Sequence, residues 1–278
     1  MADILVTGGT GKTGRRVVAQ LGNAGLVARV AARRPPSGGV RFDWADPETF
    51  GPALHGIGAA YLVAPPGEGD PLAAMEPFLR RALAAGVQRY VLLSASFLPE
   101  GGPLMGQVHA FLRAEAPEWT VLRPSWFMQN FSEQQHLPSI RDEGMIRTAT
   151  GDGRIGFVHA ADIAAVAVAA LQGRAPGNRD YVLTGPQALS YDEVAALIAA
   201  EAGRPVVHRR LTEQELTGWL SETAGVPRDF AAALAAMDTA IAGGAEDRVS
   251  PDIQAVTGRF PTSFRAFAAE NRAVWQPA

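Results

Sequence analysis

Cysteine is absent from the 278 residues of this chain. Its absence excludes disulfide bridges, thiolate nucleophiles and cysteine-ligated metal sites, and it leaves the redox compartment open. The five histidines, at positions 55, 109, 136, 159 and 208, show no paired spacing of the HxxxH kind. We therefore expect no metal ion.

Long apolar runs and clusters of positive charge are also missing. No stretch is long enough to span a bilayer, and Met1-Ala2 leads directly into a predicted strand rather than into a signal peptide. The arginines are scattered and the formal net charge is −3, so no phosphate-tracking surface is indicated. These features predict a cytoplasmic protein with a small-molecule substrate that binds neither membrane nor nucleic acid. A homodimer is left open.

What is present begins with a glycine-rich turn. Residues 3–14 read DILVTGGTGKTG, in which an apolar strand precedes the glycines and an amphipathic helix follows them. Gly8 permits a tight turn, Gly11 lets the backbone approach a pyrophosphate, and Gly14 lets the helix pack closely on the strand. This order is typical of a dinucleotide-binding fold.

Two alternatives exist for the same turn. Gly11-Lys12-Thr13 spells the end of the nucleoside-triphosphate motif GxxxxGK[ST], but the first glycine of that motif would fall on Val6, inside the strand. An ordinary glycine-rich loop is the other alternative. The strand and helix on either side favour the dinucleotide site.

The end of the next predicted strand, 27–32, indicates which nicotinamide cofactor binds. A protein that prefers NAD usually has an acidic residue there, whereas this chain has Arg33 and Arg34, which can pair with a 2′-phosphate. Solvated surface charge is the alternative. We therefore predict that the cofactor is NADP(H). Asp43 either contacts its adenine or caps a turn. The predicted cofactor-binding residues lie in the glycine turn and at the ends of strands: Gly8, Thr10, Gly11, Lys12, Thr13, Gly14, Arg33, Arg34, Asp43, Ala64, Pro65, Pro66 and Ser94.

Predicted strands and helices alternate along the chain. Further strands are expected at 40–42, 58–64, 89–94, 119–123 and 180–184, with their carboxyl ends along one edge of a parallel sheet. Beyond about residue 186 the pattern is mostly helical. We predict an α/β fold with a doubly wound parallel Rossmann sheet (1–131 and 151–185) and a small, mostly helical C-terminal substrate lobe (132–150 and 186–278).

Five motifs resemble the NmrA-like group of atypical short-chain dehydrogenases/reductases. They are TGGTGKTG at the start, VLLSAS ending at Ser96, TVLRPSWFMQNF at 120–131, FVHAADIAAV at 157–166 and YVLTGPQALSYDEVA at 181–195. The likeness covers essentially the whole chain. It implies bound NADP(H), a Rossmann domain and a C-terminal lobe that varies with substrate. The group includes reductases of quinones, imines, iminium ions and carbonyls, and also redox-sensing regulators.

The catalytic Tyr-x-x-x-Lys pair of ordinary short-chain dehydrogenases is absent. The chain has one lysine, Lys12, and the residue four positions before it is Gly8. In the corresponding stretch, PLMGQVHA at 103–110, His109 is the only titratable group, and it is either the proton donor or a packing residue. By analogy with relatives, Ser94 rather than Ser96 is expected to hold the substrate oxygen, with strand-end turn chemistry as the alternative.

An apolar wall for the substrate is predicted after the strand at 119–123. The segment PSWFMQNF at 124–131 gathers large side chains, although such clusters are often core, and its asparagine has an amide suited to orient a carbonyl or the nicotinamide carboxamide. His159 and Asp162 are expected to support the fold. The predicted substrate pocket comprises Phe97, Met105, Trp126, Phe127 and Asn130.

Together these features predict an NADPH-dependent reductase. It transfers hydride to a small or medium-sized apolar conjugated acceptor, such as an imine or iminium ion, an enone, a quinone or a ketone, with secondary metabolism as one setting. Such acceptors need little help from an enzymic acid, which is consistent with the missing tyrosine–lysine pair. The alternatives are a non-catalytic NADP(H)-sensing regulator and an isomerase or cyclase that does not consume its cofactor.

Overall fold

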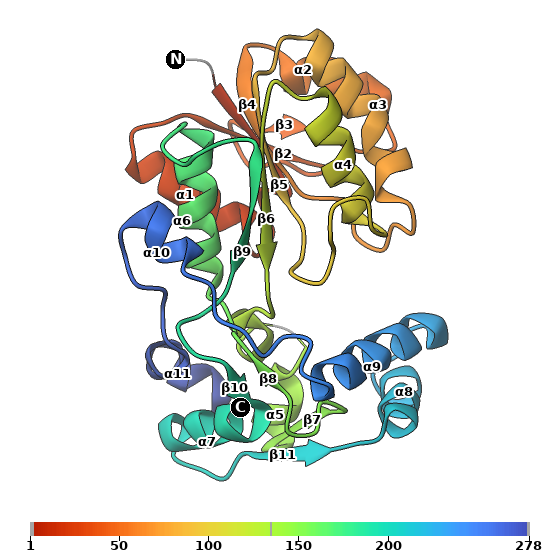
Figure 1. Ribbon diagram of the computed structural model, residues 1–278, viewed down its shortest axis with the longest axis vertical. Helices are drawn as coiled ribbons and strands as arrows, with labels where there is room; N and C mark the ends of the chain where they lie inside the picture. The colour runs from red at the N-terminus through yellow and green to blue at the C-terminus, as the bar shows by residue number, and fades with distance from the viewer. Residues whose placement is uncertain (1–2, 134, 277–278) are drawn as a thin grey trace. The chain divides into compact units, whose positions relative to one another are not determined.

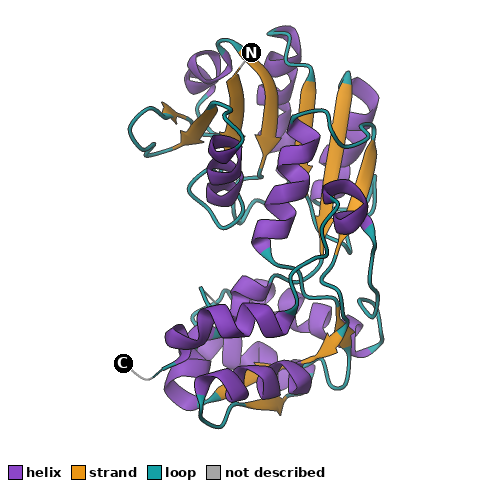
Figure 2. Cartoon of the chain, turned by 90° about the vertical axis from the view of Figure 1, so that its left-hand side faces the viewer, coloured by secondary structure: helices purple, strands orange, loops and turns teal. Residues whose placement is uncertain are grey.

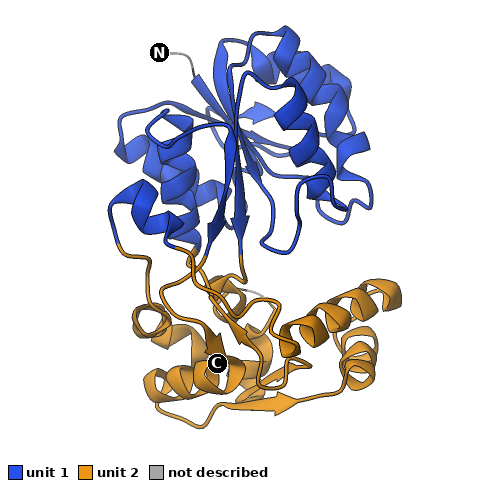
Figure 3. Cartoon of the chain, in the orientation of Figure 1, with its two compact units in different colours: residues 1–124, 160–183, 251–259 blue, residues 125–159, 184–250, 260–278 orange. Residues whose placement is uncertain are grey.

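The computed structural model describes residues 3–133 and 135–276, and the chain divides into two compact units (Figure 3). Unit 1 comprises residues 1–124, 160–183 and 251–259, and unit 2 comprises residues 125–159, 184–250 and 260–278. The boundaries predicted from the sequence differ from these at four places: they put 125–131, 151–159 and 184–185 in the nucleotide-binding part and 251–259 in the lobe. The difference arises because the chain leaves unit 1 at the last residues of two strands, Pro124 and Leu183.

Unit 1 is built around a seven-stranded, wholly parallel sheet in the order β3-β2-β1-β4-β5-β6-β9 (Figure 1). This order has the strand-order reversal of a doubly wound fold, and cofactors bind at the carboxyl ends of the strands beside it. The strands are β1 (Asp3–Thr7), β2 (Ala28–Ala32), β3 (Val40–Arg41), β4 (Ile57–Leu62), β5 (Arg89–Leu93), β6 (Glu118–Pro124) and β9 (Arg179–Leu183).

Helices cover both faces of this sheet. One face is covered by α1 (Gly14–Asn23), α6 (Ala160–Leu171) and α10 (Asp252–Thr257), and the other by α2 (Phe50–Leu54) with its leading turn Pro47–Thr49, α3 (Pro71–Ala84) and α4 (Met105–Glu115) (Figure 1). The Rossmann-like α/β fold is therefore confirmed. Helix α6 is apolar on nearly all sides because it lies between the sheet strands, α1 and α10.

Unit 2 is mostly helical, with two small two-stranded sheets (Figure 2). Antiparallel β8 and β10 form one sheet, and parallel β7 and β11 form the other. Its elements are η2 (Met128–Phe131), α5 (Leu137–Glu143), β7 (Met145–Thr148), β8 (Arg154–Ile155), β10 (Leu189–Ser190), α7 (Tyr191–Ala202), β11 (Val207–Arg210), α8 (Glu213–Glu222), α9 (Arg228–Ala242), α11 (Phe264–Asn271) and η3 (Arg272–Trp275).

Two apolar clusters hold unit 2 together. In the larger one Phe131 makes edge or tilted ring contacts with Phe157, Tyr191 and Phe264, and the buried Trp275 donates its indole N–H to the Phe131 carbonyl at 2.7 Å. The smaller cluster joins α8 and α9. Since Phe131 is fully buried in the larger cluster, this part of the predicted aromatic wall is core.

Candidate cofactor and substrate site

The glycine turn between β1 and α1 has the geometry that its residues require. Gly8 has φ +60°, and its carbonyl oxygen accepts from the Gly11 N–H at 2.8 Å. A Cβ on Gly14 would lie 2.2 Å from that same oxygen, which no side chain can tolerate. Gly8, Thr10 and Gly11 are exposed, so the backbone of the turn is open to a ligand.

Three buried side chains anchor this turn to the sheet. The Thr7 hydroxyl donates to the Tyr61 carbonyl at 3.1 Å and accepts from the Val63 N–H at 2.8 Å. The Tyr61 hydroxyl donates to Thr13 Oγ1 at 3.0 Å, just before α1 begins. Burial raises the pKa of Tyr61 well above its ordinary value, so this donor keeps its proton. Sequence reasoning missed Thr7 and Tyr61, because nothing in the pattern pairs residues so far apart.

The two arginines after β2 are exposed and uncompensated. Within the described part of the chain, Arg33 and Arg34 form no hydrogen bond or ion pair through their guanidiniums. Lys12 is half-buried in the glycine turn, and its carbonyl accepts from Arg16 Nη1 at 2.7 Å. Strand β2 is paired with β1, and the glycine turn follows β1. The two unpaired arginines after β2 therefore lie at the strand next to the one that leads into this turn.

The other predicted cofactor contacts also follow strand ends. Asp43 comes after β3, and its Oδ1 accepts from the Ala45 N–H at 3.1 Å, which is the turn-capping alternative. Ala64, Pro65 and Pro66 follow β4, partly or fully exposed. These positions lie at the carboxyl edge of the sheet, where a dinucleotide binds in this fold.

The two serines after β5 differ in their surroundings. Ser94 N–H donates to the Leu122 carbonyl at 2.8 Å, but its Oγ is buried without any hydrogen-bond partner. Ser96 is buried, and its carbonyl accepts from Arg123 Nη2 at 2.8 Å. A buried hydroxyl without a partner is costly unless a ligand pairs with it, which favours Ser94 as the residue that meets a substrate or cofactor oxygen.

His109 lies on α4 and is only 2% exposed. Its ring contacts Trp119, the second residue of β6, with centroids 5.1 Å apart, and neither ring nitrogen has a hydrogen-bond partner. Burial lowers the pKa of His109, although Asp180 and Glu100 oppose that shift. Its assignment as proton donor stays a prediction, and this contact toward the amino end of β6 favours the packing alternative.

The five predicted pocket residues belong to different units. Phe97 and Met105 are in unit 1, where Phe97 is 42% exposed and Met105 opens α4. Trp126, Phe127 and Asn130 are in unit 2, all half-buried. The Asn130 carbonyl accepts from the His136 N–H at 3.0 Å, and Phe127 forms a bridge with Val158.

Unit 2 contains a cavity of about 330 Å³, the size of a small-molecule site. Of the predicted pocket residues, Trp126 lines it. The rest of the lining comes from the segments before α5 and between α8 and α9, and from β7, α7, α8 and α9: Gln135, His136, Arg147, Tyr191, Leu216, Trp219, Leu220, Ala224, Val226, Leu234, Met237 and Asp238. These residues are scattered through the sequence, so no motif pointed to them.

Titratable groups at this cavity are perturbed by burial. Desolvation lowers the pKa of His136 to about 3, and its Nε2 has no hydrogen-bond partner. Desolvation also raises the pKa of Asp238 to about 6, while its Oδ2 accepts from the Ala149 N–H at 2.9 Å. Perturbed groups beside an apolar cavity are a physical sign of a functional site.

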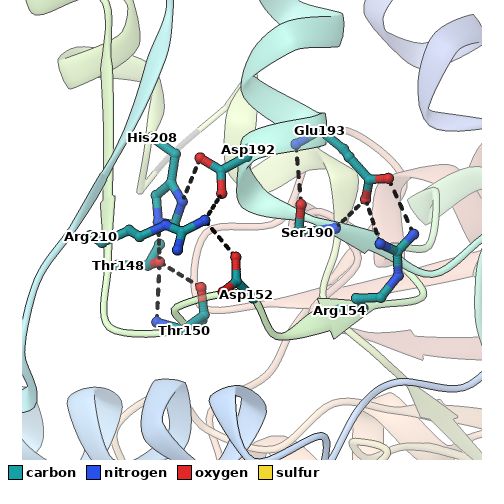
Figure 4. A network of polar contacts seen from close by, with 9 residues as sticks. All are labelled: Thr148, Thr150, Asp152, Arg154, Ser190, Asp192, Glu193, His208 and Arg210. Atoms are coloured by element: carbon teal, nitrogen blue, oxygen red, sulfur yellow. Dashed lines mark hydrogen bonds and ion pairs between the residues drawn. The ribbon is translucent and has the colours of Figure 1, made fainter.

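A polar network fastens β7 and β11 to α7 (Figure 4). Thr148 Oγ1 lies 2.8 Å from His208 Nε2, and His208 Nδ1 lies 3.4 Å from an Asp192 oxygen, an order that superficially matches a hydroxyl–histidine–carboxylate triad. Arg210 pairs with Asp192 and Asp152, both at 2.6 Å. Since Thr148 is only 1% exposed, its hydroxyl is out of reach of a substrate, and the network is structural.

In residues 3–133 and 135–276, no three His, Cys, Asp or Glu side chains gather as a metal-binding group. None of the helices there has both the length and the apolar character needed to cross a membrane.

Comparison with known proteins identifies the family. A family model described as NAD(P)H-binding matches residues 8–174. An uncharacterized oxidoreductase, YesF, of Bacillus subtilis (strain 168) is 45% identical over 98% of this chain and 96% of its own. The agroclavine dehydrogenase of Claviceps fusiformis is 41% identical over 98% of both chains.

A solved structure shares the fold. The NADPH-dependent quinone oxidoreductase QOR2 of Escherichia coli, complexed with NADPH, superposes with a TM-score of 0.82 at 23% identity, covering 96% of this chain and 99% of that one. The glycine turn, the parallel sheet and these relatives agree. The chain belongs to the NAD(P)H-binding family and is an NAD(P)H-dependent oxidoreductase.

Proposed function

We propose that this protein is an NADPH-dependent reductase of small or medium-sized, apolar, conjugated acceptors: imines or iminium ions, enones, quinones or ketones. The observation that carries the proposal is the pair of exposed, uncompensated arginines after β2, beside a glycine turn that leaves its backbone open. Guanidiniums pair well with the 2′-phosphate of NADPH, a group that NADH lacks.

The residues present fit the cofactor. The turn from Gly8 to Gly14 would hold the pyrophosphate, Arg33 and Arg34 the 2′-phosphate, and the Ala64 to Pro66 segment would flank the nicotinamide end. NADPH, when bound, supplies a hydride. The Ser94 hydroxyl would donate to the carbonyl oxygen or neutral imine nitrogen of the acceptor, because its Oγ is buried and lacks a partner within the protein.

No acid–base pair of the ordinary dehydrogenase type is available to move a proton. The single lysine, Lys12, lies in the glycine turn, and His109 is buried with a lowered pKa. Orientation and exclusion of water must therefore supply most of the rate enhancement. Acceptors that are already electrophilic, such as iminium ions and quinones, suit such a site.

The relatives support the enzymatic class over a regulator. The agroclavine dehydrogenase that resembles this chain is named for a redox reaction, and YesF is named an oxidoreductase. Neither name defines the acceptor of this protein.

A panel of acceptors tests the proposal. Purified protein is mixed with NADPH and, in parallel, a naphthoquinone, a cyclic enone, a cyclic iminium salt and an aryl ketone, and NADPH oxidation is followed at 340 nm. We expect turnover with at least one conjugated acceptor and slower turnover with NADH. Binding of NADPH without oxidation by any acceptor would contradict the proposal, and the Ser94→Ala variant provides the matched low-activity control.

A further inference from the structure

We propose that the unit 2 cavity binds a hydrophobic amine in its cationic form, with the Asp238 carboxylate as the counter-ion of the ammonium group. That the iminium ion corresponding to such an amine is the molecule reduced, with the amine as product, rests on the proposed function. Binding of the amine itself does not.

The argument begins with the charges on the cavity wall. Arg147 and Asp238 are the lining residues that carry a formal charge at neutral pH, since desolvation keeps His136 and Tyr191 uncharged. Arg147 is already paired: its Nη1 lies 3.1 Å from Glu143 Oε1, its Nη2 bonds Oε2, and its guanidinium lies 5.2 Å from the Trp219 ring centroid. Its charge is therefore compensated by Glu143 of α5 and by the Trp219 ring of α8.

Asp238 has no such partner. Within the described residues its carboxylate takes part in no ion pair, and its Oδ2 accepts a hydrogen bond from the Ala149 N–H at 2.9 Å. It lies on α9 in a lining that is largely apolar, and burial raises its pKa to about 6, so it is mainly ionised at neutral pH. A desolvated carboxylate that lacks a cation is unfavourable, and a bound cation removes that penalty.

The rest of the lining indicates the size and polarity of the uncharged part of the ligand. Leucine and methionine side chains of α8 and α9, with Val226 from the segment between these helices, cover one part of the cavity, and the rings of Trp126, Trp219 and Tyr191 provide aromatic surface. Aromatic faces attract cations and also pack on flat apolar rings. The buried Nε2 of His136, which has no partner, offers a further hydrogen bond to a polar atom on the ligand. A volume of about 330 Å³ accommodates a ligand of two or three fused rings.

Matched probes of one shape test the charge requirement. The whole protein, without cofactor, is titrated by calorimetry with 2-naphthylmethylamine, 2-naphthylmethanol and 2-naphthoate at pH 7.5. We expect the amine to bind about tenfold more tightly than the alcohol, and the carboxylate to bind most weakly. Equal binding of amine and alcohol, tighter binding of the carboxylate, or no saturable binding of the amine would overturn the proposal.

The variant Asp238→Asn assigns the effect to one residue. It should reduce amine affinity about tenfold while leaving the alcohol within about twofold, because the amide keeps the acceptor for Ala149 and loses the charge. Asp229→Asn, at an exposed acid on the same helix, is the control and should change neither. Retained preference for the amine in Asp238→Asn would overturn the assignment.

A pH series on the wild type keeps the test independent of whether that variant folds. The other ionisable groups that line the cavity are Arg147, which is paired with Glu143, and His136 and Tyr191, whose pKa values burial lowers to about 3 and raises, respectively. The pKa of Asp238, raised to about 6, lies between pH 5 and 8. Amine affinity should therefore fall as the pH drops below about 6, and alcohol affinity should not. The same fall for both probes would contradict the proposal.

The inference and the proposed function fail separately. These titrations contain no NADPH and no reducible bond, so they report on the cavity alone. If the protein binds the amine selectively but none of the acceptors supports NADPH oxidation, the proposed reductase function is wrong and the cation site stands. Turnover without amine selectivity would do the reverse.

Discussion

At the scale of single residues, cofactor choice is assigned to two exposed guanidiniums after β2. Replacing Arg33 and Arg34 by serine removes the charges that pair with a 2′-phosphate while leaving the glycine turn intact. We expect the Kd for NADPH to rise about 10- to 100-fold and that for NADH to stay within about twofold, since charge-assisted hydrogen bonds are worth about 1–3 kcal/mol each. Fluorescence titration measures both. Arg265→Ser, an exposed arginine of unit 2, is the control, and an equal loss for both cofactors would argue against the assignment.

Ser94 and His109 make different predictions for catalysis. Ser94→Ala removes a hydroxyl without a partner in the protein, so it should spare stability and lower kcat for the acceptor about 10- to 100-fold. His109→Leu should leave kcat within about twofold, because neither ring nitrogen is hydrogen-bonded and the ring is buried against Trp119. Steady-state rates with NADPH measure both. A large loss of kcat in His109→Leu, with unchanged thermal stability, would instead establish His109 as the proton donor.

At the scale of elements, the entry into α1 is the most constrained place in the chain. Gly14→Ala would put a Cβ 2.2 Å from the Gly8 carbonyl, so the turn must open. We expect a loss of about 2–4 kcal/mol in unfolding free energy and a large loss of NADPH affinity. Gly22→Ala, in the same helix with open space around it, should stabilise by about 0.5–1 kcal/mol through helix propensity. Chemical denaturation compares the two, and equal stability of both variants would contradict this view of the turn.

The sheet is the part of the fold that sequence reasoning predicts well. Buried parallel strands appear as apolar runs between glycine and proline signals, so the runs at 58–64 and 89–94 correspond to β4 and β5 with ends displaced by one or two residues. Helices α7 and α8 begin at capping boxes that can be read from the sequence, Ser190–Glu193 and Thr212–Glu215.

The small sheets of unit 2 were beyond that reasoning. Strands β8 and β10 have two residues each, too few for an alternating pattern. The cavity could not be predicted either. In the sequence Asp238 is a single acidic residue on an alanine-rich helix, and only the folded chain brings α9 near β7 and α7, where they line the cavity together. Trp126 could be singled out because it follows a strand end, where ligands gather in this fold.

At the scale of the whole molecule, two buried groups give opposing pH dependences of stability. His136 is neutral in the folded state, with a pKa of about 3 against an ordinary 6.5. Its contribution to the free energy of unfolding is therefore fully present above pH 6.5 and is lost as the pH falls toward 3. The slope is at most about 1.4 kcal/mol per pH unit. His136→Phe, which keeps a ring stacked on Phe131, should flatten this acid limb. Thermal unfolding between pH 4 and 8 measures it, and an unchanged limb would contradict the assignment.

Asp238 acts with the opposite sign. Its pKa in the folded state, about 6, lies above the ordinary 3.8. Its contribution to the free energy of unfolding is therefore fully present below pH 3.8 and is lost as the pH rises through 6. Asp238→Asn should therefore raise the unfolding free energy by about 1–2 kcal/mol at pH 8, a shift of a few degrees in Tm. Little change is expected near pH 4. A destabilised Asp238→Asn protein at pH 8 would show that the carboxylate is already compensated.

The central claim is that hydride passes from NADPH to an acceptor bound by this protein, and isotope transfer tests it most directly. The enzyme is given (4R)- or (4S)-[4-²H]NADPH with the fastest acceptor that is reduced at carbon (an iminium ion, enone or ketone), where the label cannot exchange with water, and the product is analysed by mass spectrometry. The account predicts one deuterium in the product from one of the two labelled cofactors and none from the other. Product without deuterium from either cofactor would contradict it.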